Sequence, residues 1–102
     1  LKSLRPARHS ERTRISAKVR APLLGAIERG VPVFNAGDHS SCVAIYRQVL
    51  ETLTADKQLG EETWAHQVSR RALERSSKLS DTNAAWTLRG AIDSILGSLP
   101  AQ

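Results

Sequence analysis

The chain has 102 residues, a length that supports one domain. Aromatic residues make up only 4%, so a core must be built mainly from Leu, Ile, Val and Ala, and the single cysteine, Cys42, excludes an intrachain disulfide or a cysteine-based zinc site. The longest apolar run has only a few residues, far short of the roughly 20 that a membrane-spanning helix needs, so we expect no transmembrane segment.

Charge is distributed unevenly along the chain. The formal net charge is +5, but residues 1–20 hold seven bases against one acid, whereas residues 21–102 hold eight bases and nine acids. A folded nucleic-acid-binding domain normally carries its basic charge on the folded surface itself. We therefore predict two parts, an extended basic N-terminal arm over residues 1–20 and a nearly neutral helical domain over residues 21–102.

The composition of the arm resembles that of an organellar transit peptide, because it is rich in Arg, contains three serines and is nearly free of acids. We therefore favour an organellar setting, in a plastid or a mitochondrion. A segment this polar buries too little apolar area to order itself, so we expect a partner to hold it. The alternative is a tail that stays in solvent.

The first helix is the hardest to delimit. Five apolar residues share one face at 3.6-residue spacing, namely Ile15, Val19, Leu23, Ala26 and Ile27. Pro22 interrupts this run, so either a helix begins with Pro22 in its first turn or a longer helix bends there. Gly30 followed by Pro32 predicts the C-terminal end, with the glycine in a left-handed conformation.

Residues 31–34 are expected to form a short extended link, followed by a turn over residues 35–38. Asp38 is a natural N-cap for the next helix, because its carboxylate suits the positive end of the helix dipole. That helix is predicted over residues 39–55 and is the most strongly patterned segment of the chain. Its apolar stripe comprises Cys42, Ile45, Tyr46, Val49, Leu50 and Leu53.

After a loop over residues 56–60, a third helix is predicted over residues 61–77. Its buried edge is expected to comprise Trp64, Val68 and Ala72. A fourth helix has Ser80 or Asp81 as its N-cap and runs to about residue 97. Its stripe comprises Ala85, Leu88, Ile92, Ile95, Leu96 and Leu99. The chain is therefore expected to be all-α, a small antiparallel bundle of about four helices.

No combination of residues predicts catalysis. His39 and Cys42 lie three residues apart beside Asp38, an arrangement that suits a thiolate activated at a helix N-terminus. Cys42, however, lies at the centre of the apolar stripe, where a free cysteine behaves as a small hydrophobic residue. The glycines match no phosphate-binding loop, and no Ser/His/Asp or Cys/His set is evident. We therefore expect no enzymatic activity, no cofactor and no metal.

Trp86 does not belong to the apolar stripe of the fourth helix. At 100° per residue it lies about a quarter-turn away, near Arg89 and Asp93. Tryptophan is enriched at the energetic centres of protein interfaces, so Trp86 is a candidate partner anchor, and the alternative is a lid over one end of the core. The residues predicted to contact a partner are Arg5, Arg8, Arg12, Arg14, Lys18, Arg20, Trp86 and Arg89.

The run Gly30-Val-Pro-Val-Phe-Asn-Ala-Gly-Asp38 is followed by Cys42 and by Ile45-Tyr46. Together they resemble a motif, G-V-P-x-F/Y-N-x-G-D-x-x-x-C-x-x-I-Y, of small helical domains of poorly defined function in algal and bacterial proteins. The run Ala85–Ala91 looks like a later part of such a domain. The resemblance implies no specific chemistry, but algal organelle assemblies contain many small accessory subunits.

A second resemblance is to the helical hairpin of tetratricopeptide repeats. The spacing of the second helix of such a repeat is matched by Gly37, Asp38, Cys42, Tyr46 and Val49, and Gly30 matches the glycine of its first helix. Pro32, however, falls where the first helix has to continue, and no 34-residue repeat follows.

We therefore expect a non-catalytic accessory subunit or interaction module of a larger, organellar assembly, in which the helical domain docks on a protein partner and the basic arm lies in a groove on it. One alternative is a nucleic-acid-associated accessory protein, ribosomal or nucleoid, whose arm neutralises phosphates. The other is a small-ligand-binding domain with a cavity between helices near Cys42, Tyr46 and Trp64.

Overall fold

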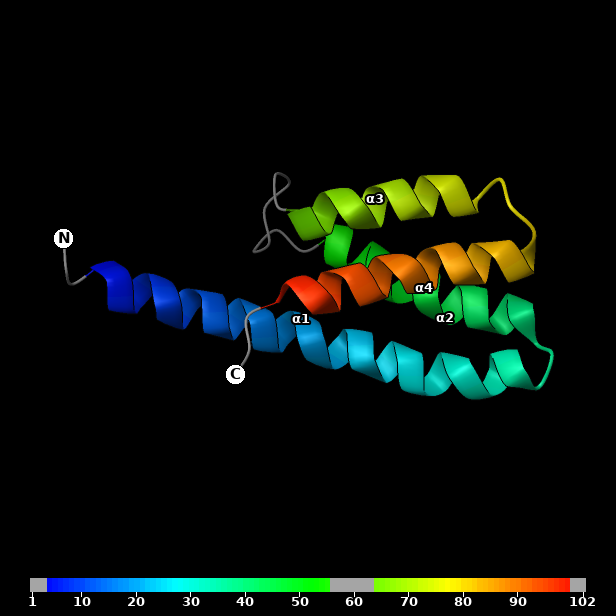
Figure 1. Ribbon diagram of the computed structural model, residues 1–102, viewed down its shortest axis with the longest axis horizontal. Coiled ribbons are helices and arrows are strands. Elements are labelled where there is room, and N and C mark those ends of the chain that lie inside the picture. The colour runs from blue at the N-terminus through cyan, green and yellow to red at the C-terminus, as the bar shows by residue number, and fades with distance from the viewer. Residues whose placement is uncertain (1–3, 56–63, 100–102) are drawn as a thin grey trace.

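The computed structural model describes residues 4–55 and 64–99, and side chains are described from residue 18 onward. Within these ranges the chain forms four helices, α1 (Leu4–Asn35), α2 (His39–Ala55), α3 (Trp64–Ser76) and α4 (Asp81–Ser98). Successive helices run antiparallel; α2 packs against all three others, and α4 lies between α1 and α3 (Figure 1). The predicted all-α bundle of about four helices is confirmed.

Helix α1 is longer than the sequence predicts at both ends. Its backbone is helical from Leu4, within the range expected for the arm, and its N-terminal half projects past the ends of the other helices (Figure 1). Pro22 and Pro32 lie inside the helix, and both are exposed. The carbonyl groups that lose a hydrogen-bond donor at these prolines therefore lie on the solvent side, where water can replace the donor.

The predicted end of α1 at Gly30 is wrong, because the helix continues to Asn35 and includes the expected link over residues 31–34. The residue in the left-handed conformation is Gly37, with φ of 91°. Two backbone hydrogen bonds form a Schellman cap around it, from the N–H groups of Gly37 and Asp38 to the carbonyls of Phe34 (3.0 Å) and Val33 (2.9 Å).

Helix α2 has the bounds that the sequence predicts, and Asp38 caps it. One carboxylate oxygen of Asp38 accepts the Ser41 N–H at 3.1 Å, and the other accepts the Ser41 hydroxyl at 2.7 Å. The Ser41 side-chain and backbone hydrogen bonds hold the pKa of Asp38 below its ordinary value. The charged carboxylate therefore lies at the positive end of the helix at neutral pH. The buried residues of α2 are Cys42, Tyr46, Val49, Leu50 and Leu53.

Helix α3 departs from its predicted pattern. The predicted start at residue 61 and the loop over residues 56–60 lie outside the described residues. Trp64, expected on the buried edge, is 51% exposed, while Val68 is half-buried. The buried residues are mostly small or polar, namely His66, Ser69, Ala72 and Ser76. Small side chains allow α3 to lie close to α2 and α4, and the bulky Trp64 falls outside that contact.

Helix α4 contributes the largest share of fully buried aliphatic side chains. Ser80, rather than Asp81, is its N-cap and accepts the Asn83 N–H at 3.4 Å. Its most deeply buried residues are Leu88, Ile92 and Ile95, as the stripe predicts. Burying a side chain of this size stabilises a fold by about 1.5–3 kcal/mol, so the packing of α4 on α2 and α3 makes a large contribution to stability.

Helix α4 ends where the sequence predicts, within one residue. Leu99 follows it in an extended conformation, the backbone geometry favoured for a residue that precedes proline. Among the described helices, none combines the length and the apolar character that crossing a bilayer requires.

Candidate functional site

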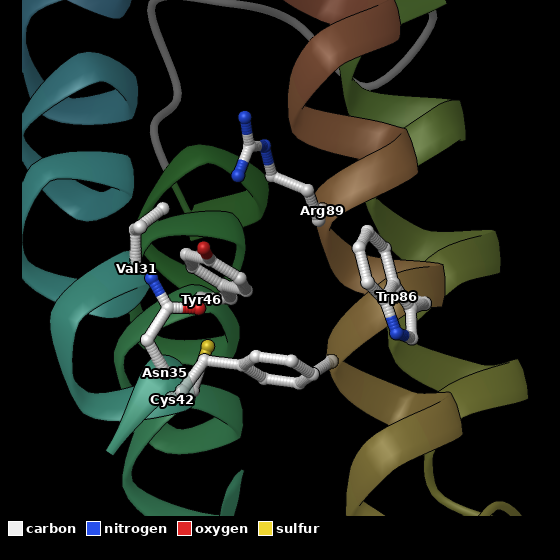
Figure 2. Close-up of a pocket in the computed structure, with 8 residues that line it drawn as sticks. Val31, Asn35, Cys42, Tyr46, Trp86 and Arg89 are labelled. Carbon is white, nitrogen blue, oxygen red and sulfur yellow. The ribbon is translucent and has the colours of Figure 1, made fainter. Parts of the chain in front are cut away.

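A cleft lies between α1 and α4, with α2 as its floor (Figure 2). Each of the two flanking helices packs closely on α2, but α1 and α4 touch each other at only a few positions. The cavity that remains between them has a volume of about 170 Å³. It is lined from α1 by Val31, Phe34 and Asn35, from α2 by Cys42 and Tyr46, and from α4 by Ala85, Trp86 and Arg89.

Aromatic rings from three elements meet on one side of this cleft. Trp86, which is 61% exposed, contacts Phe34 edge-on, with ring centroids 5.6 Å apart at an interplanar angle of 73°. Phe34 also lies against His39, with centroids 4.3 Å apart. The Nδ1 atom of His39 is 3.0 Å from the Thr82 hydroxyl, which links the start of α2 to α4. These contacts hold the Phe34 ring in place and leave most of the Trp86 indole in solvent.

The floor of the cleft consists of two buried, uncharged groups. Burial raises the pKa values of the Cys42 thiol and the Tyr46 phenol, so both keep their protons at neutral pH. The Tyr46 ring lies directly on the backbone of Gly30, because a Cβ atom at residue 30 would be only 2.5 Å from the ring. The glycine that the sequence assigns to a helix end is therefore a site of close helix packing.

The cleft has one cationic group, Arg89. Its side chain is 30% exposed, and its Nε–H donates to the Asp93 carboxylate at 3.1 Å. Burial acts to lower the pKa of Arg89, but the hydrogen bonds to Asp93 and Tyr46 outweigh this effect and raise it. The guanidinium lies across the opening between α1 and α4, above Tyr46 (Figure 2).

These contacts give no support to a reactive Cys42. A raised pKa leaves the side chain as a neutral thiol, whereas the thiolate is the nucleophile and the metal ligand. His39, its nearest histidine in sequence, contacts Thr82 and Phe34. Within the described part of the chain, no three His, Cys, Asp or Glu side chains gather as metal ligands require.

The structure brings together two of the residues predicted to contact a partner, Trp86 and Arg89, which both line the cleft. Lys18 is exposed on α1 and Arg20 is half-buried there, both with interactions within the fold. The remaining four lie in the N-terminal half of α1, where only the backbone is described, namely Arg5, Arg8, Arg12 and Arg14.

The inter-helical cavity expected near Cys42, Tyr46 and Trp64 is only partly matched. Cys42 and Tyr46 line the cleft, whereas Trp64 is at the start of α3 and is not part of the lining. Sequence reasoning missed the α1 wall, because Val31 and Phe34 were expected in an extended link. Val31 and Phe34 continue the helical spacing of Leu23 and Ile27, and this spacing is the signal that could have placed them on the helix.

No protein-family model matches the chain, and no curated protein or solved structure matches it either.

Proposed function

We propose that this chain is a non-catalytic accessory subunit that binds a protein partner, with the cleft between α1 and α4 as its principal docking site. The observation that carries this proposal is the position of Trp86. Its indole is mostly exposed, yet it is held against Phe34 at the edge of an apolar cavity. An aromatic side chain beside a pocket is a common energetic centre of a protein interface.

The size of the cavity favours a protein partner over a free metabolite. Pockets for small molecules and cofactors are typically about 300–1,000 Å³. The volume here, about 170 Å³, is closer to that of an engineered cavity of about 150 Å³ that accepts a single benzene ring. Such a space suits one side chain delivered by a larger partner, because the rest of that partner supplies the remaining contact area.

The basic N-terminal half of α1 supports a second contact with the same partner. Residues 1–20 hold a net charge of +6 and residues 21–102 a net charge of −1. The N-terminal half of α1, which includes Arg5, Arg8, Arg12 and Arg14, projects past the ends of the other helices (Figure 1). We propose that these basic residues lie along an acidic groove of the partner, within a larger assembly of an organelle such as a plastid.

Site-specific photo-crosslinking in the native host tests this proposal. A benzoylphenylalanine at Gly90, an exposed position where an added Cβ atom meets nothing within 4 Å, reports on the surface beside Trp86. The matched control places the same group at Arg71, which is exposed on α3. We expect one partner to crosslink from position 90 and not from position 71.

The same experiment with two tryptophan variants identifies the docking residue. We expect Trp86→Ala to abolish the crosslink and Trp64→Ala, which removes the other exposed tryptophan, to leave it intact. Equal crosslinking from positions 90 and 71, or equal loss in both tryptophan variants, contradicts docking at the cleft.

Nucleic-acid association is the second candidate function, favoured by the concentration of charge in residues 1–20. Seven cations on one segment can neutralise several phosphates, and the logarithm of the affinity then falls with the logarithm of salt concentration by roughly 0.7–0.9 per phosphate. A salt titration of RNA or duplex DNA binding tests it. Affinity that stays unchanged between low and moderate salt rules this candidate out.

A further inference from the structure

The lining of the cleft is asymmetric in a way that constrains what fits it. Six of its eight residues present aliphatic, aromatic or thiol groups, namely Val31, Phe34, Cys42, Tyr46, Ala85 and Trp86. Asn35 and Arg89 supply the polar groups, and Arg89 is the only ionised one, since burial keeps Cys42 and Tyr46 neutral. A complementary occupant is therefore apolar over most of its surface and negatively charged at one place.

Arg89 has hydrogen-bonding capacity left for such a charge. Its Nε–H donates to Asp93, whereas a guanidinium has five N–H donors in a planar fork. Asp93 is 55% exposed and lies one helical turn away, so solvent weakens its attraction for Arg89. A carboxylate that arrives with a bound partner can therefore share or replace the Asp93 contact.

Three aromatic rings determine the apolar part of the occupant. The cavity is about the size of one benzene ring and is bordered by Phe34, Tyr46 and Trp86. Aromatic pairs prefer edge-on or offset contacts, and Phe34 and Trp86 already adopt an edge-on contact with each other. A further ring in the cavity extends this cluster, and it also covers the exposed face of Trp86.

Building on the proposed function, we propose that the partner inserts one aromatic side chain between Tyr46 and Trp86 and places a neighbouring carboxylate on Arg89. The partner segment is therefore an aromatic residue with Asp or Glu within one helical turn of it. The charge complementarity at Arg89 distinguishes this segment from a purely apolar helix, which leaves the open N–H donors without a partner.

The purified chain tests this anchor with two small probes, 3-phenylpropionate and 3-phenylpropionamide. They have the same ring and differ in the negative charge. Trp64→Phe leaves Trp86 as the single tryptophan, so its fluorescence reports binding at the cleft alone. A hydrogen bond to a charged group is stronger than one between neutral groups, so we expect the acid to bind at least tenfold more tightly than the amide.

Two variants in the Trp64→Phe chain distinguish a specific carboxylate site from a general apolar one. Arg89→Gln is expected to reduce the affinity for the acid to that for the amide. Asp93→Asn, at an exposed position where folding is not at risk, removes the competing carboxylate and is expected to strengthen acid binding. Circular dichroism spectra and melting curves verify that both variants fold.

Three outcomes overturn the proposal. The first is equal affinity for acid and amide, or an Asp93→Asn variant that binds the acid no better. The second is a crosslinked partner segment at position 90 that has no aromatic residue next to an acid; in that case docking at the cleft stands and the anchor chemistry fails. The third is acid binding without any crosslinked partner, which instead indicates a free aromatic acid as ligand and removes the proposed function too.

Discussion

Helix α4 contacts a different kind of surface on each of its two sides. On the α3 side, small and polar residues are buried, and Ser76 accepts a hydrogen bond at 2.7 Å from Arg47 of α2. On the α1 side, bulky groups such as Phe34 and Tyr46 hold the helices apart, and a cavity remains. The α3 side is therefore closed by short side chains, whereas the α1 side is apolar and open.

This difference explains why two exposed tryptophans in one small bundle are not equivalent. Trp64 lies at the start of α3, outside the cleft. Trp86 borders the cavity and contacts Phe34. Only Trp86 combines an exposed surface with an adjacent space into which a partner can insert, so exposure alone does not identify a docking site.

The largest expected effect on stability comes from replacing a glycine by alanine, and it is seen by comparing this substitution in α1 and in α4. Gly30→Ala places a Cβ against the Tyr46 ring and is expected to lower the free energy of unfolding by about 1–3 kcal/mol, because the buried ring has to move. Gly90→Ala meets nothing within 4 Å and is expected to raise it by about 0.4–1 kcal/mol. Urea denaturation of both variants measures this, and equal effects would falsify the close contact between α1 and α2.

The second comparison concerns the contact between α2 and α3. Ser76→Ala removes the hydrogen bond from Arg47 and is expected to cost about 0.5–1.5 kcal/mol of unfolding free energy. Ser77→Ala is the matched control, because the Ser77 hydroxyl is exposed and bonds only the Glu74 carbonyl of its own segment. Chemical denaturation that shows no difference between the two variants contradicts a structural role for the Arg47–Ser76 contact.

The third prediction concerns Ser69, which is fully buried on α3 with a hydroxyl that has no hydrogen-bond partner among the described residues. Ser69→Ala removes this group at little cost in volume, so we expect unchanged stability or a gain of up to about 1 kcal/mol. Thermal melting of the variant measures the change. A loss of stability shows that the hydroxyl is hydrogen-bonded in solution.

The smallest expected effect is a pH dependence at the start of α2. The folded-state pKa of Asp38 is lowered from its ordinary value of 3.8 by the Ser41 hydrogen bonds. Its contribution to stability is therefore present above about pH 3.8 and is lost as the pH falls through the lower, folded-state pKa. Asp38→Asn keeps a capping side chain but does not titrate there.

We expect Asp38→Asn to be a little less stable than the parent chain at neutral pH, with the difference shrinking toward pH 3. Melting curves at both pH values measure this comparison. A difference that is constant with pH indicates that the Asp38 charge makes no contribution to capping.

The sequence predicts the elements that local patterns determine. The Asp38 cap and the apolar stripe of α2 give that helix its bounds, and the Leu88, Ile92 and Ile95 spacing gives the buried face of α4. The 100° geometry of a helix also places Trp86 outside the core. In each case the deciding interaction lies within one helix or one turn of it.

The rest depends on contacts between helices. Gly30 and Pro32 together resemble a helix end, but packing of Tyr46 on Gly30 stabilises the helix through both, and Gly37 supplies the actual cap. The position of Trp64 could not be predicted from the sequence pattern either, because close packing of small residues determines which side of α3 faces the core. The cleft exists because α1 continues past Gly30 to Asn35, so it could not be predicted while the helix was expected to end at Gly30.

The unbroken path of α1 has a geometric consequence for any complex that this chain forms. Arg12 and Phe34 are 22 positions apart on one helix, and a rise of 1.5 Å per residue separates them by about 33 Å along its axis. The helix thus fixes the distance between the basic segment and the cleft. Inserting a single residue between them rotates one relative to the other by about 100°, so register, as well as charge, decides which surfaces can be engaged together.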